Sequence, residues 1–190
     1  MVKLLRQSLM MLAVMTAVTG IAYPLLVTGI AQSLFSGQAN GSVMRYADQA
    51  TGSVLIGQPF DNPGYFWGRP SATSPGADNA AASAGSNQGA NNPALIAAVS
   101  QRIDALHTAD PQNTALIPVD LVTASASGLD PQISPAAAQY QVGRVARARK
   151  LAPSQVQVLV NRATQGRQLG VLGEPRVNVL ELNLSLDGKW

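Results

Sequence analysis

The sequence predicts a mixed α+β protein with one amino-terminal transmembrane helix, followed by a single exported domain with a small sheet and about three helices. An apolar stretch long enough to span a bilayer lies near the amino terminus, and helix-like and strand-like patterns follow it. The length of 190 residues fits one domain plus an anchor. Only 12% of the residues are charged, about half the usual fraction, which indicates lipid burial together with neutral loops.

The predicted membrane anchor covers residues 9–31. The basic residues Lys3 and Arg6 precede this almost wholly apolar stretch, and no charge follows until well beyond it. A spanning helix needs about 20 apolar residues, and positive residues favour the cytoplasmic side. We therefore expect residues 1–8 in the cytoplasm and residues 36–190 in the periplasm or outside the cell, in a single-pass protein of the plasma (inner) membrane.

A cleaved signal peptide is the alternative interpretation, with Gly20 and Ala22 as the small residues before a cut at Tyr23. Pro24 directly after that cut disfavours cleavage. The apolar run also continues past the typical hydrophobic region of about 7–15 residues. These two features favour a retained anchor.

Three residues of the anchor, Thr16, Gly20 and Tyr23, recur at helical spacing and would share one face. Small residues allow close helix contacts in lipid, so we expect this face to pack against other membrane helices. The alternative is that Gly and Thr are simply common in membrane helices. Pro24 is expected to kink the helix or to begin a second segment.

The exported part begins with short predicted strands at residues 53–57 and 64–67, separated by turn-forming residues. Residues 71–92 follow as an irregular loop rich in Gly, Ala and Asn. Loops this long are usually functional or disordered. Another short strand is predicted at residues 119–122.

A capping residue followed by proline opens two predicted helices, at Asn92 and at Ser134. The first helix has an apolar face made of Leu95, Val99, Ile103 and Leu106. The second is expected to end near Lys150, and Pro153 opens a third helix.

The carboxyl-terminal residues 177–186 show the clearest alternation in the chain. From residue 180 onward, leucines at even positions alternate with the polar residues Glu181, Asn183, Ser185 and Asp187. A period of two predicts a strand with one face in the core and one in solvent.

Catalytic and metal chemistry find little support in the residue inventory. The chain has no cysteine and one histidine, His107, so thiol chemistry and multi-histidine metal sites are excluded. No phosphate-binding loop or aspartyl-phosphate motif occurs. Asp120 and Asp130 are expected in caps and turns, and His107 near a helix carboxyl end. We therefore predict no catalytic residues, no metal and no enzyme activity. The net charge of +3 is also too small to indicate nucleic-acid binding.

Two further groups of side chains are candidates for contacts. Arg144 and Arg147 share a helix face that could meet an anionic partner, or could be a solvated face paired with acidic residues of the same domain. In Tyr65-Phe66-Trp67, strand alternation would send Phe66 to one side, and its two neighbours to the other. One side is expected in the core, and the other could serve as a docking or membrane-interface patch.

Blocks of sequence spread along the chain point to a known family. The continuous blocks are residues 65–72 (YFWGRPSA), 83–95 (SAGSNQGANNPAL) and 118–125 (PVDLVTAS). The interrupted blocks are 57–58 with Phe60, 127–131 with 133–134, Gln141 with 144–146 and Arg149, and 173–175 with 177–180 and 182–184. In this order and spacing they resemble, almost end to end, the C subunit of the Kdp potassium-transporting P-type ATPase of prokaryotes. The loop departs from the family pattern at Ala84, Gln88 and Ala90.

The resemblance implies an accessory, non-catalytic subunit of a high-affinity, ATP-driven potassium uptake complex. Its partners would be a channel-like potassium-binding subunit, a P-type ATP-hydrolysing subunit and a small single-span subunit. It further implies a catalytic chaperone that raises the ATP affinity of the pump subunit. The chain would need no cofactor of its own, because the complex handles ATP and potassium.

Residues in or beside the matching blocks supply the candidate sites. The candidate subunit interface comprises Tyr65, Phe66, Trp67, Arg69, Asn87 and Asn92. The candidate nucleotide or anion contact comprises Gln141, Arg144 and Arg147.

The expected topology conflicts with direct ATP contact, because it exports the domain whereas ATP is cytoplasmic. We therefore expect the domain to sit over the outer mouth of the channel-like subunit, with any effect on ATP affinity transmitted through the complex. A membrane-anchored exported enzyme or small-ligand-binding domain acting alone is an alternative. Direct nucleotide binding would require a shielded basic pocket around Arg144 and Arg147.

Overall fold

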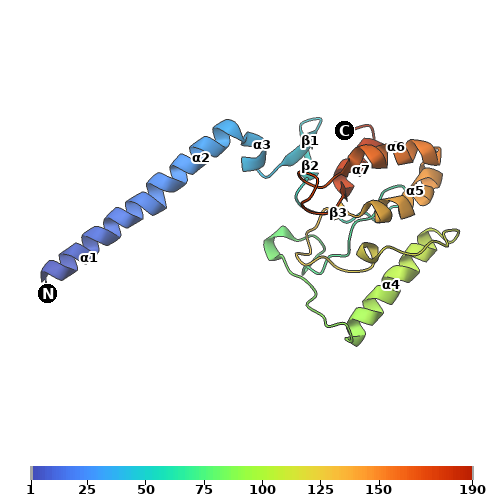
Figure 1. The fold of residues 1–190 in the computed structure, drawn as a ribbon, viewed down its shortest axis with the longest axis horizontal. Coiled ribbons are helices and arrows are strands. Elements are labelled where there is room, and N and C mark those ends of the chain that lie inside the picture. Colours follow the sequence, from blue (N-terminus) through green and yellow to red (C-terminus); the bar gives the residue numbers. More distant parts are fainter. Residues whose placement is uncertain (1, 190) are drawn as a thin grey trace. The chain divides into compact units, whose positions relative to one another are not determined.

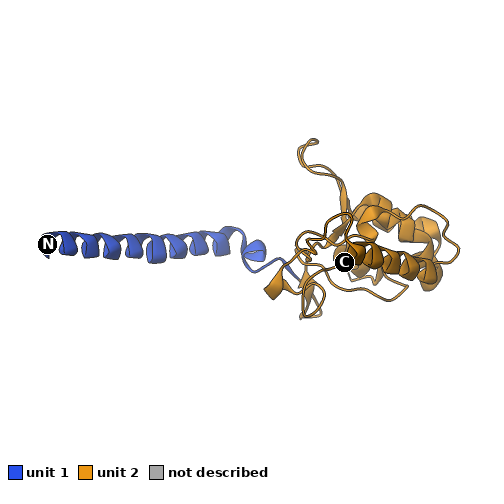
Figure 2. Cartoon of the chain, turned by 90° about the horizontal axis from the view of Figure 1, so that it is seen from below, with its two compact units in different colours: residues 1–43 blue, residues 44–190 orange. Residues whose placement is uncertain are grey.

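The computed structural model describes residues 2–189 and divides the chain into two compact units, Met1–Val43 and Met44–Trp190 (Figure 2). The first unit is almost entirely helical. The second contains the remaining helices and both small sheets (Figure 1). The predicted α+β class is confirmed.

One continuous helix of 33 residues, Val2–Leu34, forms most of the first unit. It consists of α1 (Val2–Met15), the π-helical segment η1 (Thr16–Ala22) and α2 (Tyr23–Leu34). No residue in its most apolar 18-residue stretch is buried against the rest of the chain. Among residues 2–189 no other helix is long and apolar enough to cross a membrane. At 1.5 Å per residue the helix measures about 50 Å, which exceeds the roughly 30 Å hydrocarbon core of a bilayer.

The π-helical segment explains how the helix continues past a proline. Pro24 has no N–H, so the usual bond to the carbonyl four residues earlier is lost. Just before it, the Tyr23 N–H donates to the Val18 carbonyl, five residues back. The wider π-helical turn accommodates the missing hydrogen bond of Pro24. Pro24 is therefore the second residue of α2 and does not start a separate segment.

The second unit is built around helices α5 (Pro135–Arg149), α6 (Pro153–Ala163) and α7 (Val179–Leu186), which lie together in Figure 1. The three-stranded antiparallel sheet has the order β3-β5-β4, formed by Gln132–Ile133, Arg176–Asn178 and Thr164–Gln165. In its register, Ile133 and Thr164 flank Val177. The core of this unit is fully buried at Phe66, Val145, Val156, Val177 and Leu182.

The remaining elements are mostly short. Short helix α3 is Ser36–Ala39, strands β1 (Val43–Tyr46) and β2 (Gln49–Ser53) form a two-stranded sheet, and the 3-10 turns are η2 (Ala80–Ala82) and η3 (Val119–Leu121). Helix α4 is Pro93–Ala109.

The predicted helices are confirmed, together with their local starting signals. The Asn92 side chain accepts a hydrogen bond from the Ala94 N–H, and the Ser134 hydroxyl accepts one from the Ala137 N–H. Helix α5 ends at Lys150 in a left-handed cap. These signals are local, so the sequence alone located them.

The predicted strand over 177–186 is wrong beyond Asn178, where the chain turns into α7. The Asn178 side chain caps this helix by accepting from the Glu181 N–H. Helix α7 is buried on two sides: Leu180 and Leu184 pack with Met44, whereas Leu182 packs in the main core. Because α7 is buried on two sides, its leucines occur at every second position, which is also the pattern of a half-buried strand.

The three other predicted strands are also wrong. Strand β2 ends at Ser53, whose hydroxyl accepts from the Leu55 N–H in a turn, so 53–57 is not extended. Residues 119–121 form the 3-10 turn η3, which Val122 ends, and a bond from the Leu121 N–H to the Pro118 carbonyl closes the turn. Residues 64–67 have no neighbouring strand, because side chains from helices bond their backbone instead.

The irregular loop of residues 71–92 is fixed against the segment 125–128. The Ser71 hydroxyl donates to the Gly128 carbonyl at 2.6 Å, and the Ala84 N–H donates to the Ser127 carbonyl. Gly128 has φ +68°, and a Cβ there would lie 2.6 Å from the Ala84 carbonyl oxygen. Glycine is therefore required where the two segments meet.

Candidate functional site

The aromatic segment 62–71 begins with a turn at residues 62–65 and continues without regular secondary structure, and two buried amide side chains hold its backbone. Asn183 in α7 accepts from the Phe66 N–H at 2.8 Å and donates to the Phe66 carbonyl at 3.0 Å. Gln141 in α5 accepts from the Trp67 N–H at 2.8 Å and donates to the Trp67 carbonyl at 3.1 Å. Each amide thus replaces the strand neighbour that this segment lacks.

Two arginines of α5 hold the preceding residues of the segment. Arg144 donates to the Pro63 carbonyl at 2.6 Å, and Arg149 donates to the Gly64 carbonyl at 2.6 Å. Their guanidinium groups also lie over the rings of Trp67 and Tyr65, at 4.4 and 4.5 Å from the ring centroids. The aromatic pair is therefore engaged by cation–π contacts within the chain.

Asp187 connects this arrangement to the end of α7. Its carboxylate accepts from the Tyr65 hydroxyl at 2.9 Å and from Arg149 at 2.8 Å. Burial raises the pKa of Asp187, but hydrogen bonds from Arg149, Tyr65 and Lys189 outweigh burial and hold the pKa below its ordinary value. The carboxylate is therefore a stable anion that fixes the segment.

The structure accounts for the predicted opposition of Phe66 to its two neighbours. Phe66 is fully buried, whereas Tyr65 and Trp67 are half-buried beside the arginines. Arg69, farther along, donates to Asp130 at 3.1 Å and to the Ala124 carbonyl. These four interface candidates thus lie together.

Asn87 and Asn92 lie apart from the aromatic segment and have local roles in the chain. Asn87 is exposed in the loop with φ +51°, and Asn92 caps α4. No subunit contact is tested for any of the six candidates, so the interface stays a prediction.

The three residues of the candidate anion contact bond other groups of the protein, and of the two arginines only Arg147 is exposed, with 53% of its side chain accessible. Arg144 is 4% exposed and also donates to Gln141, and Arg147 pairs with the buried carboxylate of Asp110. Burial lowers the pKa of Arg144 to about 10, against the opposing effects of Asp110 and Tyr140. An anion bound by Arg144 would have to displace these internal partners.

The anchor candidates lie in the π-helical segment or directly after it. Thr16 and Gly20 share a face, since a Cβ at Gly20 would lie 3.8 Å from the Thr16 methyl group. Thr16, Gly20 and Tyr23 are all exposed in the isolated chain. Packing against other membrane helices stays a prediction.

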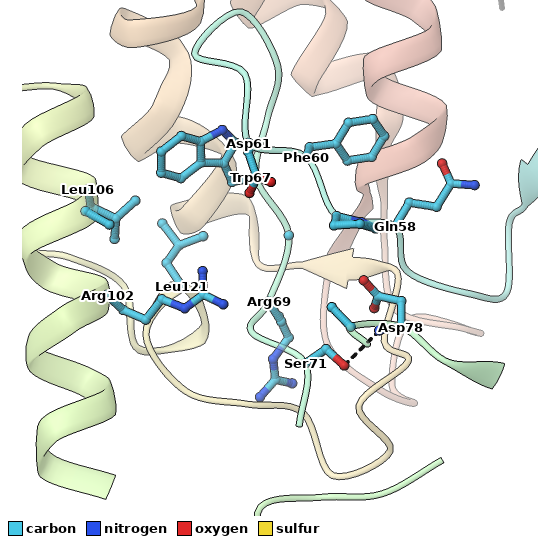
Figure 3. A pocket seen from close by; sticks show the side chains of 14 residues that line it. Gln58, Phe60, Asp61, Trp67, Arg69, Ser71, Asp78, Arg102, Leu106 and Leu121 are labelled. Carbon is cyan, nitrogen blue, oxygen red and sulfur yellow. Dashed lines mark hydrogen bonds between the residues drawn. The ribbon is translucent and has the colours of Figure 1, made fainter. Parts of the chain in front are cut away.

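A pocket of about 160 Å³ opens between the aromatic segment and α4 (Figure 3). Leu106 and Arg102 enter from α4 on one side, and Asp78 and Gln58 lie on the other. Burial raises the pKa of Asp78. Pockets for drug-sized ligands measure about 300–1,000 Å³, so this one is too small for a nucleotide.

The hydroxyl of Ser71, which lines this pocket, is engaged in bonds within the loop. The Ser71 hydroxyl donates to the Gly128 carbonyl and accepts from the Asp78 N–H at 2.9 Å. Asp120 and Asp130 have the predicted turn and cap contacts, to Ser134 and to the Gln132 N–H. Among residues 2–189, no group of three His, Asp or Glu side chains converges in a way that could hold a metal ion.

Sequence reasoning missed the role of Asn183, which it placed on the wet face of a strand. A signal was available in the spacing of Asn178 and Glu181, which matches a helix amino-terminal cap followed by an acidic third residue. That spacing predicts α7, and a helix turns Asn183 toward the aromatic segment.

The comparisons with known proteins cover nearly the whole chain. The sequence model of the family described as KdpC, K+-transporting ATPase, c chain, matches residues 5–188. The potassium-transporting ATPase KdpC subunit of Methylococcus capsulatus is 62% identical over 187 residues, covering 98% of both chains. Two proteins of the same name are also similar to this chain. That of Sorangium cellulosum is 61% identical over 97% of both chains, and that of Herpetosiphon aurantiacus is 64% identical over 96% of this chain and 94% of the other.

Proposed function

The chain belongs to the KdpC family, the c chain of K+-transporting ATPases, and from that premise we propose that it is an accessory, non-catalytic subunit of a high-affinity, ATP-driven potassium uptake complex. It assembles there with a channel-like potassium-binding subunit, a P-type ATP-hydrolysing subunit and a small single-span subunit. The observation that carries this proposal is the match to the family over residues 5–188.

The exposed helix supports a role in an assembly. An apolar helix of 33 residues with nothing buried in its own chain needs lipid or other membrane helices around it. The polar side chains of the second unit support a non-catalytic role, because Asn183, Gln141, Arg144 and Arg149 all bond the aromatic segment. The alternative is an anchored enzyme or ligand-binding domain acting alone. It has less support, because these polar side chains bond the protein's own backbone.

The proposed orientation places residues 1–8 in the cytoplasm, the anchor 9–31 in the plasma membrane and residues 36–190 outside. Lys3 and Arg6 before the apolar stretch support it. The exported domain then sits over the outer mouth of the potassium-binding subunit and stabilises it. As a catalytic chaperone it raises the ATP affinity of the pump subunit through the complex, since the donors of Arg144 are engaged internally.

Site-specific labelling tests the orientation. The chain has no cysteine, so single cysteines can be introduced at two exposed positions, Gln165→Cys in β4 and Gln7→Cys before the span. A membrane-impermeant maleimide should label the first in intact cells, and the second only after permeabilisation. The reverse pattern would refute the proposed orientation.

Purification of the complex tests the assembly. A tagged chain extracted in mild detergent should retain the potassium-binding and ATP-hydrolysing subunits, and the complex lacking the chain should need more ATP for half-maximal hydrolysis. Stable purification of the chain without partners, with turnover or binding of a small molecule, would favour the alternative. An unchanged ATP requirement would rule out the chaperone role while leaving assembly in place.

A further inference from the structure

The turn between β4 and β5 presents three apolar side chains to solvent. Leu169 is 90% exposed, Val171 72% and Leu172 56%. We call these three residues the hairpin tip. Single exposed apolar residues are ordinary on a protein surface, but three of them within four positions on one turn indicate a contact.

The hairpin tip is held in one shape. Gln168 and Leu172 exchange two backbone hydrogen bonds of 2.9 Å, and the Val171 N–H donates to the Gln168 carbonyl. At the base, one nitrogen of Arg167 donates to both carboxylate oxygens of Glu174, at 2.7 and 2.8 Å.

Leu169 adopts a backbone conformation that leucine rarely takes. Its φ is +52°, and the following Gly170 has φ +77°. Left-handed backbone is unfavourable for a residue with a Cβ, and more so for a bulky one. Strain of this kind persists where the surrounding structure imposes it, and it often marks a functional contact.

The charge and rigidity of the turn indicate what contacts it. Residues 168–173 carry no charge, and the flanking Arg167 and Glu174 neutralise each other, so the complementary surface is apolar and uncharged. A fluid lipid surface requires no fixed shape, whereas a protein pocket does. Because the backbone of the turn holds Leu169 in a fixed position, we expect its side chain to contact a protein pocket and not lipid.

The small size of the hairpin tip restricts the partner further. Stable complexes of free proteins bury about 1,200–2,000 Å², far more than three side chains can supply. A partner held in the same membrane is present at high effective concentration, so a small contact suffices. The helix Val2–Leu34, which ends shortly before the second unit begins, provides that tether.

We propose that the hairpin tip inserts Leu169 into an apolar pocket on the exposed surface of a membrane-embedded subunit of the same complex. This inference rests on the proposed function, because that function supplies the partner. Leu169 is the central anchor of the contact, with Val171 and Leu172 at its margin.

The test compares Leu169→Asn with Leu116→Asn in the full-length chain. Leu116 is 95% exposed elsewhere in the second unit, so it controls for removal of an exposed leucine. Asparagine tolerates left-handed backbone, so L169N should fold at least as well as the unchanged chain, which thermal unfolding verifies. In competition with the untagged, unchanged chain for the other subunits, L169N should assemble about 10- to 100-fold less well, and L116N equally well.

The outcomes separate this proposal from the proposed function. If the unchanged chain retains no ATPase subunit, both the proposed function and the hairpin contact are refuted. If the unchanged chain assembles and L169N competes equally, only the hairpin contact is overturned. An environment-sensitive fluorophore on Leu169→Cys should shift its emission only in the complex, and a shift in vesicles holding the chain alone would identify lipid as the occupant and overturn the proposal.

Discussion

The aromatic segment depends on Asn183, and Asn183→Leu tests that dependence. Asn183 is 2% exposed and bonds both backbone groups of Phe66. Leucine is similar in size and favours helix, so the substitution removes the two hydrogen bonds with little change in volume. The buried N–H and carbonyl of Phe66 then lose their partners.

The magnitude follows from the two unsatisfied groups. Each buried polar group without a partner costs about 1–3 kcal/mol, so the pair should lower the free energy of unfolding by about 2–6 kcal/mol. For a chain of this size, 1 kcal/mol moves Tm by about 2–4 °C. N183L should therefore lower Tm by about 4–24 °C.

Thermal unfolding of the full-length chain in mild detergent, followed by near-ultraviolet circular dichroism, measures this change. Asn161→Leu is the matched control, because Asn161 is exposed on α6 and should change stability by less than about 0.5 kcal/mol. A Tm for N183L within 1 °C of the control would show that the amide does not hold the segment.

Three other substitutions test neighbouring features by the same measurement. Arg144→Lys loses the forked donors and the contact over Trp67 and should cost about 2–4 kcal/mol; an unchanged Tm would contradict this. The pKa of Asp187 is lowered in the folded protein, so its stabilisation is complete above about pH 5 and is lost as the pH falls through that lowered pKa. Asp187→Asn should therefore show a smaller loss of Tm between pH 5 and pH 3, and an equal loss would disprove the linkage. Gly128→Ala places a methyl group against the Ala84 carbonyl at positive φ and should cost more than about 1 kcal/mol, whereas full stability would show that the loop 71–92 is not fixed there.

The arginines of α5 show how far sequence reasoning reached at the candidate site. It identified Arg144 and Arg147 as a pair on one face and associated Gln141 with them. Whether that face met solvent, an anion or the protein's own backbone depended on the position of residues 63–67, far away in the sequence. Folding brings the Pro63 carbonyl to Arg144 across 81 positions, and no local pattern encodes that contact.

The sequence by itself determined the features that rest on local signals. The uncharged apolar stretch predicted the long apolar helix Val2–Leu34, and the capping residues followed by proline predicted the starts of α4 and α5. Residues 64–67 and 179–186 were decided only by tertiary structure. The first is held in place without a strand partner because Gln141 and Asn183 bond it from 74 and 117 positions away. The second is helical because the core covers it on two sides. Hydrophobic pattern and propensity describe neighbours in sequence, whereas these two segments take their conformation from partners that only folding brings near.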